Sequence, residues 1–310
     1  MTVLKFLNLD GSGPNGVKEL LKWQVTERLA GRRRSNPSRA PVPTVAPDLV
    51  KLATPPAPGQ PARLTWLGHA SFLVQLDGVS LLLDPVLMPA INGVIRRNVP
   101  PGVPLERLPP IDASLVSHSH YDHLDNPSLR RVKARVIAGT GIGRIVRPLP
   151  CEELGWWQSA RVGPVTVTFV PSQHWSKRSL FATNDTLWGG FVVDGSTARL
   201  YHSGDTAYFD GFAEIGRRFP GIDAAMLPIG AYDPDWFMER QHMNPEQAAR
   251  AFTDLGARTF VAMHWGTFKL TDEALTEPPQ RLHAEWERRA LPPEAKRVLA
   301  IGESLDVTKP

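Results

Sequence analysis

The chain has 310 residues, of which 42% are hydrophobic and 21% are charged, and its formal net charge at pH 7 is +4. This composition supplies a substantial core, and the length fits one large α/β domain. The single cysteine, Cys151, excludes an internal disulfide framework and a cysteine-based zinc finger. The first apolar run is too short for a signal peptide, and no segment approaches the roughly 18 apolar residues of a membrane-spanning helix. We therefore expect a cytoplasmic protein, either fully soluble or peripheral to the membrane.

The first 60 residues differ in composition from the rest, so we expect an N-terminal segment over residues 1–60 and a main domain over residues 61–310. Residues 16–30 have the apolar spacing of an amphipathic helix. Its apolar stripe consists of Val17, Leu20, Leu21, Val25 and Leu29. These five positions favour docking on the chain's own domain or on a second subunit, whereas the arginine cluster at 32–34 leaves open a peripheral contact with anionic lipid headgroups. The Pro-rich span that follows predicts an extended arm along a surface.

Strand and helix patterns alternate from residue 63 onward. Two or three short strands are predicted by RLTWLGHASFLVQLDGVSLLLDP, with a turn at Asp77 and Gly78. Further strands are predicted by ASLVS, RVIAG, VTVTFV, GGFVV, ARLYH, AAMLPI, TFVAMH and RVLAI. Helices are predicted over residues 126–132, 211–218, 245–255 and 278–289. Asn244 before Pro245 marks the start of the third helix. This alternation favours a single layered α/β domain.

Metal-capable side chains follow four of the predicted strands. They are His118 after ASLVS, His174 after VTVTFV, Asp205 after ARLYH and His264 at the end of TFVAMH. The segment SHSHYDHLD around the first of them adds His120, Asp122 and His123. Ligands in layered α/β folds collect at the carboxyl ends of strands, so we expect these seven side chains to converge.

The residue types indicate a pair of divalent ions. Imidazole and carboxylate ligands without thiolate suit zinc, and also iron or manganese. Seven ligands are too many for one tetrahedral ion, but they suit two ions that share a bridging carboxylate, Asp205. The first ion is assigned to His118, His120 and His174. The second is assigned to Asp122, His123 and His264. A two-metal site lowers the pKa of bound water to about 7 and so generates a hydroxide nucleophile, which predicts a hydrolase.

The motif HSHYDH, followed by a lone histidine, the SGD aspartate and a late strand-end histidine, resembles the metallo-β-lactamase superfamily. That resemblance implies an αββα four-layer sandwich with the metals at one edge of the two sheets. Over residues 63–304, the motifs TWLGHAS, LLLDPVL, PSQHWSKR, HSGDTAY and QHMNPEQA resemble N-acyl-phosphatidylethanolamine-hydrolysing phospholipases D and their bacterial relatives. This second resemblance implies two zinc ions per chain, phospholipase D-type release of phosphatidic acid and N-acylethanolamine, and a homodimer.

Two further side chains carry over from the resemblance as substrate contacts, Tyr121 and His242. His242 precedes a helix start and could donate a hydrogen bond or a proton to a phosphate oxygen or to the leaving group. The alternatives are a capping or packing role for His242 and a packing role for Tyr121. With Asp205 and Asp122, His242 completes the predicted catalytic group, and Asp84 is expected to orient a ligand histidine.

Other residues and functions remain as alternatives. We expect His69 to pack or to form a hydrogen bond, His202 to be structural and His283 to face solvent. Lys177 and Arg178 either attract a phosphate or form a solvated pair. The same metals would also serve a lactonase, or a phosphodiesterase for soluble nucleotide or sugar-phosphate substrates, and a non-catalytic metal-binding protein is the third alternative. Nucleic acid is not an expected partner, because the basic residues form only one short cluster.

Overall fold

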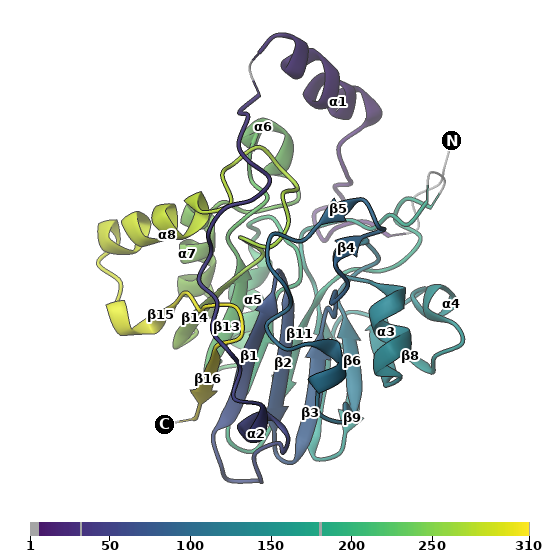
Figure 1. The fold of residues 1–310 in the computed structure, drawn as a ribbon, viewed down its shortest axis with the longest axis vertical. Helices are drawn as coiled ribbons and strands as arrows, with labels where there is room; N and C mark the ends of the chain where they lie inside the picture. Colours follow the sequence, from purple (N-terminus) through teal and green to yellow (C-terminus); the bar gives the residue numbers. More distant parts are fainter. Residues whose placement is uncertain (1–5, 32, 180–181, 310) are drawn as a thin grey trace.

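A computed structural model describes residues 6–31, 33–179 and 182–309, and two sheets packed face to face form its centre (Figure 1). Within the described residues each sheet has seven strands, in the orders β16-β1-β2-β3-β6-β7-β8 and β15-β14-β13-β12-β11-β10-β9. The first sheet contains β1 (Ala62–Gly68), β2 (Ser71–Leu76), β3 (Val79–Leu83), β6 (Ala113–Val116), β7 (Arg135–Gly139), β8 (Cys151–Leu154) and β16 (Ser304–Val307). The second contains β9 (Ser159–Val162), β10 (Val165–Val170), β11 (Gly190–Asp194), β12 (Arg199–His202), β13 (Ala224–Pro228), β14 (Thr259–Met263) and β15 (Lys296–Arg297).

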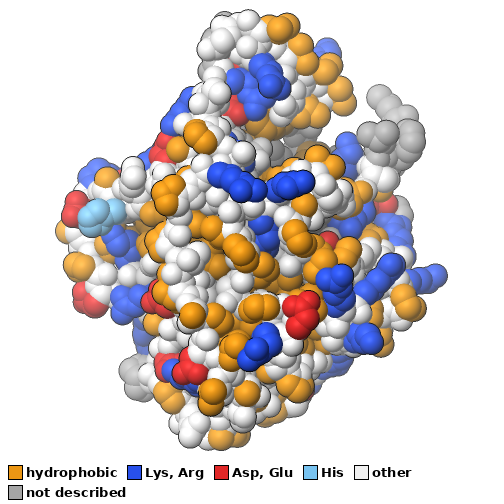
Figure 2. Space-filling view, viewed as in Figure 1, with side chains coloured by type: hydrophobic (Ala, Val, Ile, Leu, Met, Phe, Trp, Pro, Cys, Tyr) orange, Lys and Arg blue, Asp and Glu red, His pale blue; other side chains and the backbone are white. Residues whose placement is uncertain are grey.

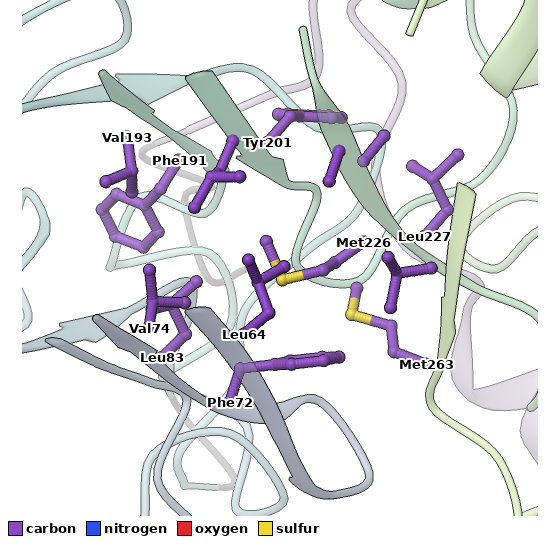
Figure 3. Packing of buried hydrophobic residues seen from close by; sticks show 14 of the residues in the cluster. Leu64, Phe72, Val74, Leu83, Phe191, Val193, Tyr201, Met226, Leu227 and Met263 are labelled. Carbon is purple, nitrogen blue, oxygen red and sulfur yellow. The ribbon is translucent and has the colours of Figure 1, made fainter. Parts of the chain in front are cut away.

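The main core lies between the two sheets. Figure 3 shows Leu64, Phe72 and Leu83 of the first sheet opposite Phe191 and Met226 of the second, all of them fully buried or nearly so. Successive side chains of a strand point to opposite faces, so a strand that is covered on both sides is apolar throughout. In β2, Phe72 and Val74 point into this core, whereas Leu73 packs on the outer face.

Helices cover the outer face of each sheet. On the first sheet these are α2 (Leu49–Leu52), α3 (Asn126–Val132) and α4 (Gly143–Val146). On the second they are α5 (Gly211–Arg218), α7 (Pro245–Leu255) and α8 (Glu277–Arg288). The rings of Phe252 in α7 and Trp286 in α8 meet at 5.1 Å above Phe260 of β14. The predicted αββα four-layer sandwich is therefore confirmed.

The predicted helix at 16–30 is present, as α1 (Val17–Leu21) and η1 (Lys22–Glu27), a π-helical continuation. All five side chains of the apolar stripe are exposed, so the stripe is not docked on the chain's own domain, whereas its docking on a second subunit or on a lipid surface remains a prediction. Figure 2 shows hydrophobic side chains along one side of this protruding lobe. Trp23, which is outside the stripe, packs instead against Phe237 and Met238 of α6 (Asp235–Met238). Arg32 of the arginine cluster lies outside the described residues.

The Pro-rich arm runs along the sandwich to α2, as predicted (Figure 1). Its backbone pairs with Ile301 through Pro43 and Val45. The remaining elements are the hairpin of β4 (Ala90–Ile91) and β5 (Ile95–Arg96), and the 3-10 turns η2 (Leu105–Arg107) and η3 (Pro293–Ala295). In the described parts of the chain, no helix combines the length and apolarity needed to cross a bilayer. The division of the chain at residue 60 remains a prediction.

Candidate metal centre

The predicted site residues lie at one edge of the sandwich, where several strands end. β6 leads into His118, β10 into His174 and β14 directly into His264. Asp205 follows β12, which runs parallel to β13 and β14. The structure therefore brings together all seven side chains that were predicted to converge, because their strands point toward the same edge.

Three imidazoles form the first cluster. The distance from His118 Nε2 to His120 Nδ1 is 2.9 Å, and the distance from His174 Nε2 to the same His120 atom is 3.2 Å. His118 and His174 are almost completely buried. Nitrogens this close together share one point, and this cluster is the set that we predicted for the first ion.

The second cluster combines one carboxylate with imidazoles. Asp122 Oδ2 lies 3.7 Å from Nε2 of His123 and 3.7 Å from Nε2 of His264. These are the three residues predicted for the second ion. A fourth side chain, His69, joins them with Nε2 at 3.1 Å from Asp122 Oδ2.

Asp205 lies between the two clusters. Its Oδ2 is 3.1 Å from His123 Nε2 and 3.9 Å from His174 Nε2, and its Oδ1 is 3.1 Å from His264 Nε2. One carboxylate thus faces both clusters, the position that a bridging ligand occupies. That it bridges two ions remains a prediction.

Buried polar atoms at the centre fit divalent cations. Within the described residues, His123 Nε2, His264 Nε2 and Asp205 Oδ1 are buried without a hydrogen-bond partner. An unpaired buried polar atom is costly, and cation coordination would satisfy all three. The donor set, imidazole nitrogens with two carboxylates and no thiolate, suits zinc, iron or manganese.

Hydrogen bonds from the surrounding chain orient the ligand rings. Asp84 accepts from His123 Nδ1 at 2.7 Å and from the backbone N–H and the hydroxyl of Ser117, each at 2.7 Å. His174 Nδ1 lies 2.7 Å from the carbonyl oxygen of Gln241. Such contacts fix each ring so that Nε2 faces the centre. The predicted role of Asp84 is confirmed.

Burial and charge set the protonation of the clusters. Burial lowers the pKa of His120 to about 4 and the pKa values of His118 and His174 well below the usual range. Burial also opposes charge on His264, but carboxylates, Asp205 first, raise its pKa to about 9. Burial would raise the pKa of Asp205, but nearby imidazoles, His123 first, hold it well below the usual range. The first cluster therefore contains neutral imidazoles, the form that binds metal, whereas His264 and His123, whose pKa Asp205 also raises, would release their protons when a metal ion binds beside the ionised carboxylates.

A cavity of about 850 Å³ opens over the centre. His120, Asp122 and Asp205 line its inner end, and His242 and Tyr121 line it beside them. Much of the remaining lining is apolar, from the N-terminal helix, the β4–β5 hairpin and α6. Its described lysine and arginine side chains are Lys177 and Arg178; Arg178 is partly buried, stacks on Tyr121 and donates to the carbonyl oxygens of Ser119 and Leu124. The solvated-pair alternative is therefore wrong for Arg178.

The two predicted substrate contacts lie at the cavity wall. His242 Nδ1 is 3.9 Å from Asp205 Oδ2 and is buried without a hydrogen-bond partner in the described chain. Burial lowers its pKa to about 4. Asn244, and not His242, caps α7, so the capping alternative is wrong. Tyr121 is 38% exposed, and its hydroxyl donates to the carbonyl of Arg178 at 2.7 Å.

Three histidines that we set aside have defined positions. His202 is buried, with Nε2 2.9 Å from the carbonyl oxygen of Ala70, and His283 is exposed on α8, both as predicted. His69 forms the expected hydrogen bond, but its position inside the second cluster was not predicted. It directly follows β1, so the strand-end rule that found the other ligands would also have found His69.

Comparison with known proteins places the chain in a family. Residues 80–265 match a model described as the beta-lactamase superfamily domain. An uncharacterized protein of Mycobacterium tuberculosis is 37% identical over 298 residues, which cover 90% of this chain and 77% of that protein. The N-acyl-phosphatidylethanolamine-hydrolyzing phospholipase D 1 of Caenorhabditis elegans is 35% identical over 247 residues, or 70% of this chain and 68% of that protein. The chain belongs to the beta-lactamase superfamily, as the motifs predicted.

Further relatives agree with this class. A metal-dependent hydrolase of Rubrobacter xylanophilus is 34% identical over 247 residues, or 74% of this chain and 94% of that protein. The crystal structure of an isothiocyanate hydrolase from Delia radicum gut bacteria superposes with a TM-score of 0.65 at 21% identity, covering 80% of this chain and 99% of that one. The similarity to the isothiocyanate hydrolase concerns only the fold. With the histidine and aspartate clusters, the relatives define a metal-dependent hydrolase.

Proposed function

We propose that this protein is a di-zinc phosphodiesterase that hydrolyses N-acyl-phosphatidylethanolamine to phosphatidic acid and N-acylethanolamine. The observation that carries the proposal is a single cavity. Its lining includes residues of the metal-capable clusters, apolar walls and two positively charged side chains, Lys177 and Arg178. A phosphodiester between two acyl-bearing parts needs this combination. The similarity to the phospholipase D of Caenorhabditis elegans supports the same substrate class.

In this proposal each cluster holds one ion. His118, His120 and His174 hold the first, Asp122, His123 and His264 hold the second, and Asp205 contacts both. The chemistry that two bound zinc ions supply is acidification of water and neutralisation of charge on phosphate oxygens. The oxygens of Asp205 lie 3.1 Å from His123 and His264 of the second cluster, and Oδ2 lies 3.9 Å from His174 of the first, so this carboxylate can contact both positions.

The cavity residues orient the substrate. His242 is neutral at pH 7, because burial lowers its pKa to about 4, and a neutral imidazole donates one N–H hydrogen bond to a phosphate or leaving-group oxygen. Tyr121 and the positive charge of Arg178, stacked at 3.9 Å, form the neighbouring wall. Asp122 and Asp205 are the described carboxylates of the lining, so little negative charge outside the centre repels a phosphate.

The proposal includes two partners that the contacts do not test. The exposed apolar stripe of the N-terminal helix, with Lys18, Lys22 and Arg28 on the same helix, suits a peripheral contact with an anionic membrane surface. Flotation with anionic and with neutral vesicles tests that contact. If the protein floats with neither kind of vesicle, the membrane contact is contradicted. The homodimer follows from the family resemblance, and sedimentation measures it.

The functional test measures two quantities on one preparation. We expect purified protein to carry two zinc ions per chain and to release N-acylethanolamine from N-acyl-phosphatidylethanolamine in mixed micelles. A soluble nitrophenyl diester and a lactone, assayed in parallel, test the alternative activities on soluble substrates. Faster hydrolysis of either soluble substrate, relative to its uncatalysed rate, would replace the lipid proposal with that alternative.

A further inference from the structure

The N-terminal segment forms one wall of the cavity over the metal centre. Val17, Leu20 and Trp23 line the same 850 Å³ cavity as His120 and Asp205, although they lie far apart in the sequence. Opposite elements of the lining include the β4–β5 hairpin, whose Val94 and Ile95 are exposed. When an apolar ligand covers an apolar side chain that is exposed inside a cavity, the burial of both surfaces stabilises the complex.

Trp23 attaches this wall to the body of the protein. Its side chain is only 6% exposed, and its ring lies 5.0 Å from the ring of Phe237. The indole Nε1 donates to Asp272 Oδ2 at 2.9 Å. A buried indole with a satisfied N–H holds one position, because both its apolar body and its polar end are paired.

Asp272 also holds the far end of the segment. Arg33 Nε donates to Asp272 Oδ2 at 2.9 Å, and Asn36 Nδ2 donates to the carbonyl oxygen of Asp272 at 2.8 Å. Burial would raise the pKa of the Asp272 carboxyl, but hydrogen bonds from Arg33 and Trp23 hold it below the usual value. Arg34 pairs with Glu277 nearby. The buried Asp272 carboxylate therefore binds Trp23, which is in the N-terminal helix, and Arg33, which follows the end of that helix.

We infer that residues 14–23 form an acyl-chain wall, which selects substrates by the length of their apolar part, and that Asp272 keeps this wall in place. The inference rests on the proposed function, because it assigns the apolar part of the same cavity. Val17 and Leu20 contact the acyl chain of the substrate from one side. Val94 and Ile95 of the hairpin contact the acyl chain from another side. The metal-centre residues hold the phosphodiester, so the wall affects recognition of the chain and not the hydrolytic step.

The test compares two leucines of the same helix. Leu20 lines the cavity, whereas Leu29 is 84% exposed and outside the lining, so L29S is a matched control for L20S. Substrates are monomeric diesters that carry a palmitoyl or a butyryl chain. We expect L20S to lower kcat/KM about tenfold for the palmitoyl substrate and little for the butyryl one, with L29S unchanged on both. Equal losses on the two substrates, or equal losses in the two variants, would overturn the inference.

Binding of a fluorescent palmitoyl probe separates this inference from the proposed function. The probe is monomeric and carries no phosphodiester, so its dissociation constant reports the wall even if the protein hydrolyses no lipid. We expect weaker binding to L20S, by about tenfold, and parental binding to L29S. Identical binding to parent and L20S would overturn the acyl-chain wall, whereas absence of lipid hydrolysis with the expected binding would overturn only the proposed substrate.

A third variant tests the anchor. D272N removes the charge that pairs with Arg33, so we expect faster tryptic cleavage near Arg28, Arg33 and Arg34 and a smaller preference for the palmitoyl substrate. The metal content should stay at the parental value, because the hydrogen bonds and ion pair of Asp272 in the described chain go to Trp23, Arg33, Asn36 and Asp233 and not to either cluster. Parental cleavage together with parental chain preference would contradict the anchoring role.

Discussion

The carboxylate of Asp205 lies between the two clusters and faces ligands of both. Its Oδ2 lies 3.1 Å from Nε2 of His123 in the second cluster and 3.9 Å from Nε2 of His174 in the first. Asp205→Asn keeps the shape but replaces one carboxylate oxygen with an amide that binds metal poorly. We expect hydrolysis to fall by at least about 100-fold, more than for loss of a residue that only orients a ligand.

The control for this prediction is folding. Circular dichroism and the urea midpoint of D205N should stay close to those of the parent protein in matched buffer. A folded D205N that hydrolyses substrate at the parental rate would disprove the bridging assignment.

His69 gives a second prediction at the scale of one residue. It is buried, its Nε2 lies 3.1 Å from Asp122 Oδ2, and its backbone carbonyl accepts from the N–H of His264 at 3.0 Å. We expect His69→Ala to weaken binding of one ion by about 10–100-fold and to leave the other ion bound, because Asp122 loses its orientation. Calorimetric zinc titration measures both affinities. H283A, at an exposed position of α8, is the control, and equal titrations for the two variants would refute the role of His69.

The buried imidazoles predict how stability depends on pH. Burial lowers the pKa of His69 to about 3 and those of His120 and His242 to about 4, so the unfolded chain binds more protons than the folded chain between about pH 6.5 and 4. The free energy of unfolding of the metal-free protein should therefore fall as pH decreases through this window. The raised pKa of His264, about 9, acts only above pH 6.5, where its stabilisation is lost with rising pH.

Urea unfolding of chelator-treated protein, followed by tryptophan fluorescence, measures this dependence. A free energy of unfolding that is constant, or that increases, from pH 6.5 to 4 would contradict the assigned protonation states.

At the scale of one element, α7 shows how far local sequence determines structure. The predicted helix over residues 245–255 is found with the same bounds, because its start is marked chemically. Asn244 accepts from the N–H of Gln247 at 2.9 Å, and the Gln247 side chain accepts from the N–H of Asn244 at 3.1 Å. Asn244→Ala should lower the free energy of unfolding by about 1 kcal/mol without changing metal content. Unchanged stability in thermal or urea unfolding would show that the capping box contributes nothing measurable.

Other elements were not predictable from local pattern. β8 and β9 were missed because Glu152, Glu153 and Arg161 interrupt their apolar signal, and these side chains lie on exposed positions of the two strands. The predicted RVLAI strand is reduced to β15, since Ile301 pairs with the arm at Thr44 instead. The N-terminal helix was found, but its docking face depends on Asp272 and Phe237, which are distant in sequence.

For the whole molecule, the alternation of strands and helices was enough to predict one layered α/β domain, and the histidines and aspartate at the strand ends predicted seven converging side chains, whereas the four-layer sandwich was implied by the family resemblance. Strand direction places these ends at one edge, so no side-chain detail was needed. The orientation of each ring was not predictable, because it depends on partners such as Gln241 that no motif marks. The cavity was likewise unpredictable, since its walls come from the N-terminal helix, the β4–β5 hairpin and α6 together.

The most direct test of the whole account is the number of metal ions that one folded chain binds. Elemental analysis of purified protein, after zinc loading and removal of free metal, should give two ions per chain, with one fewer in a variant such as H123A that removes only a second-cluster ligand. A value of one ion or none in the parent protein would contradict a centre built from two clusters that share Asp205.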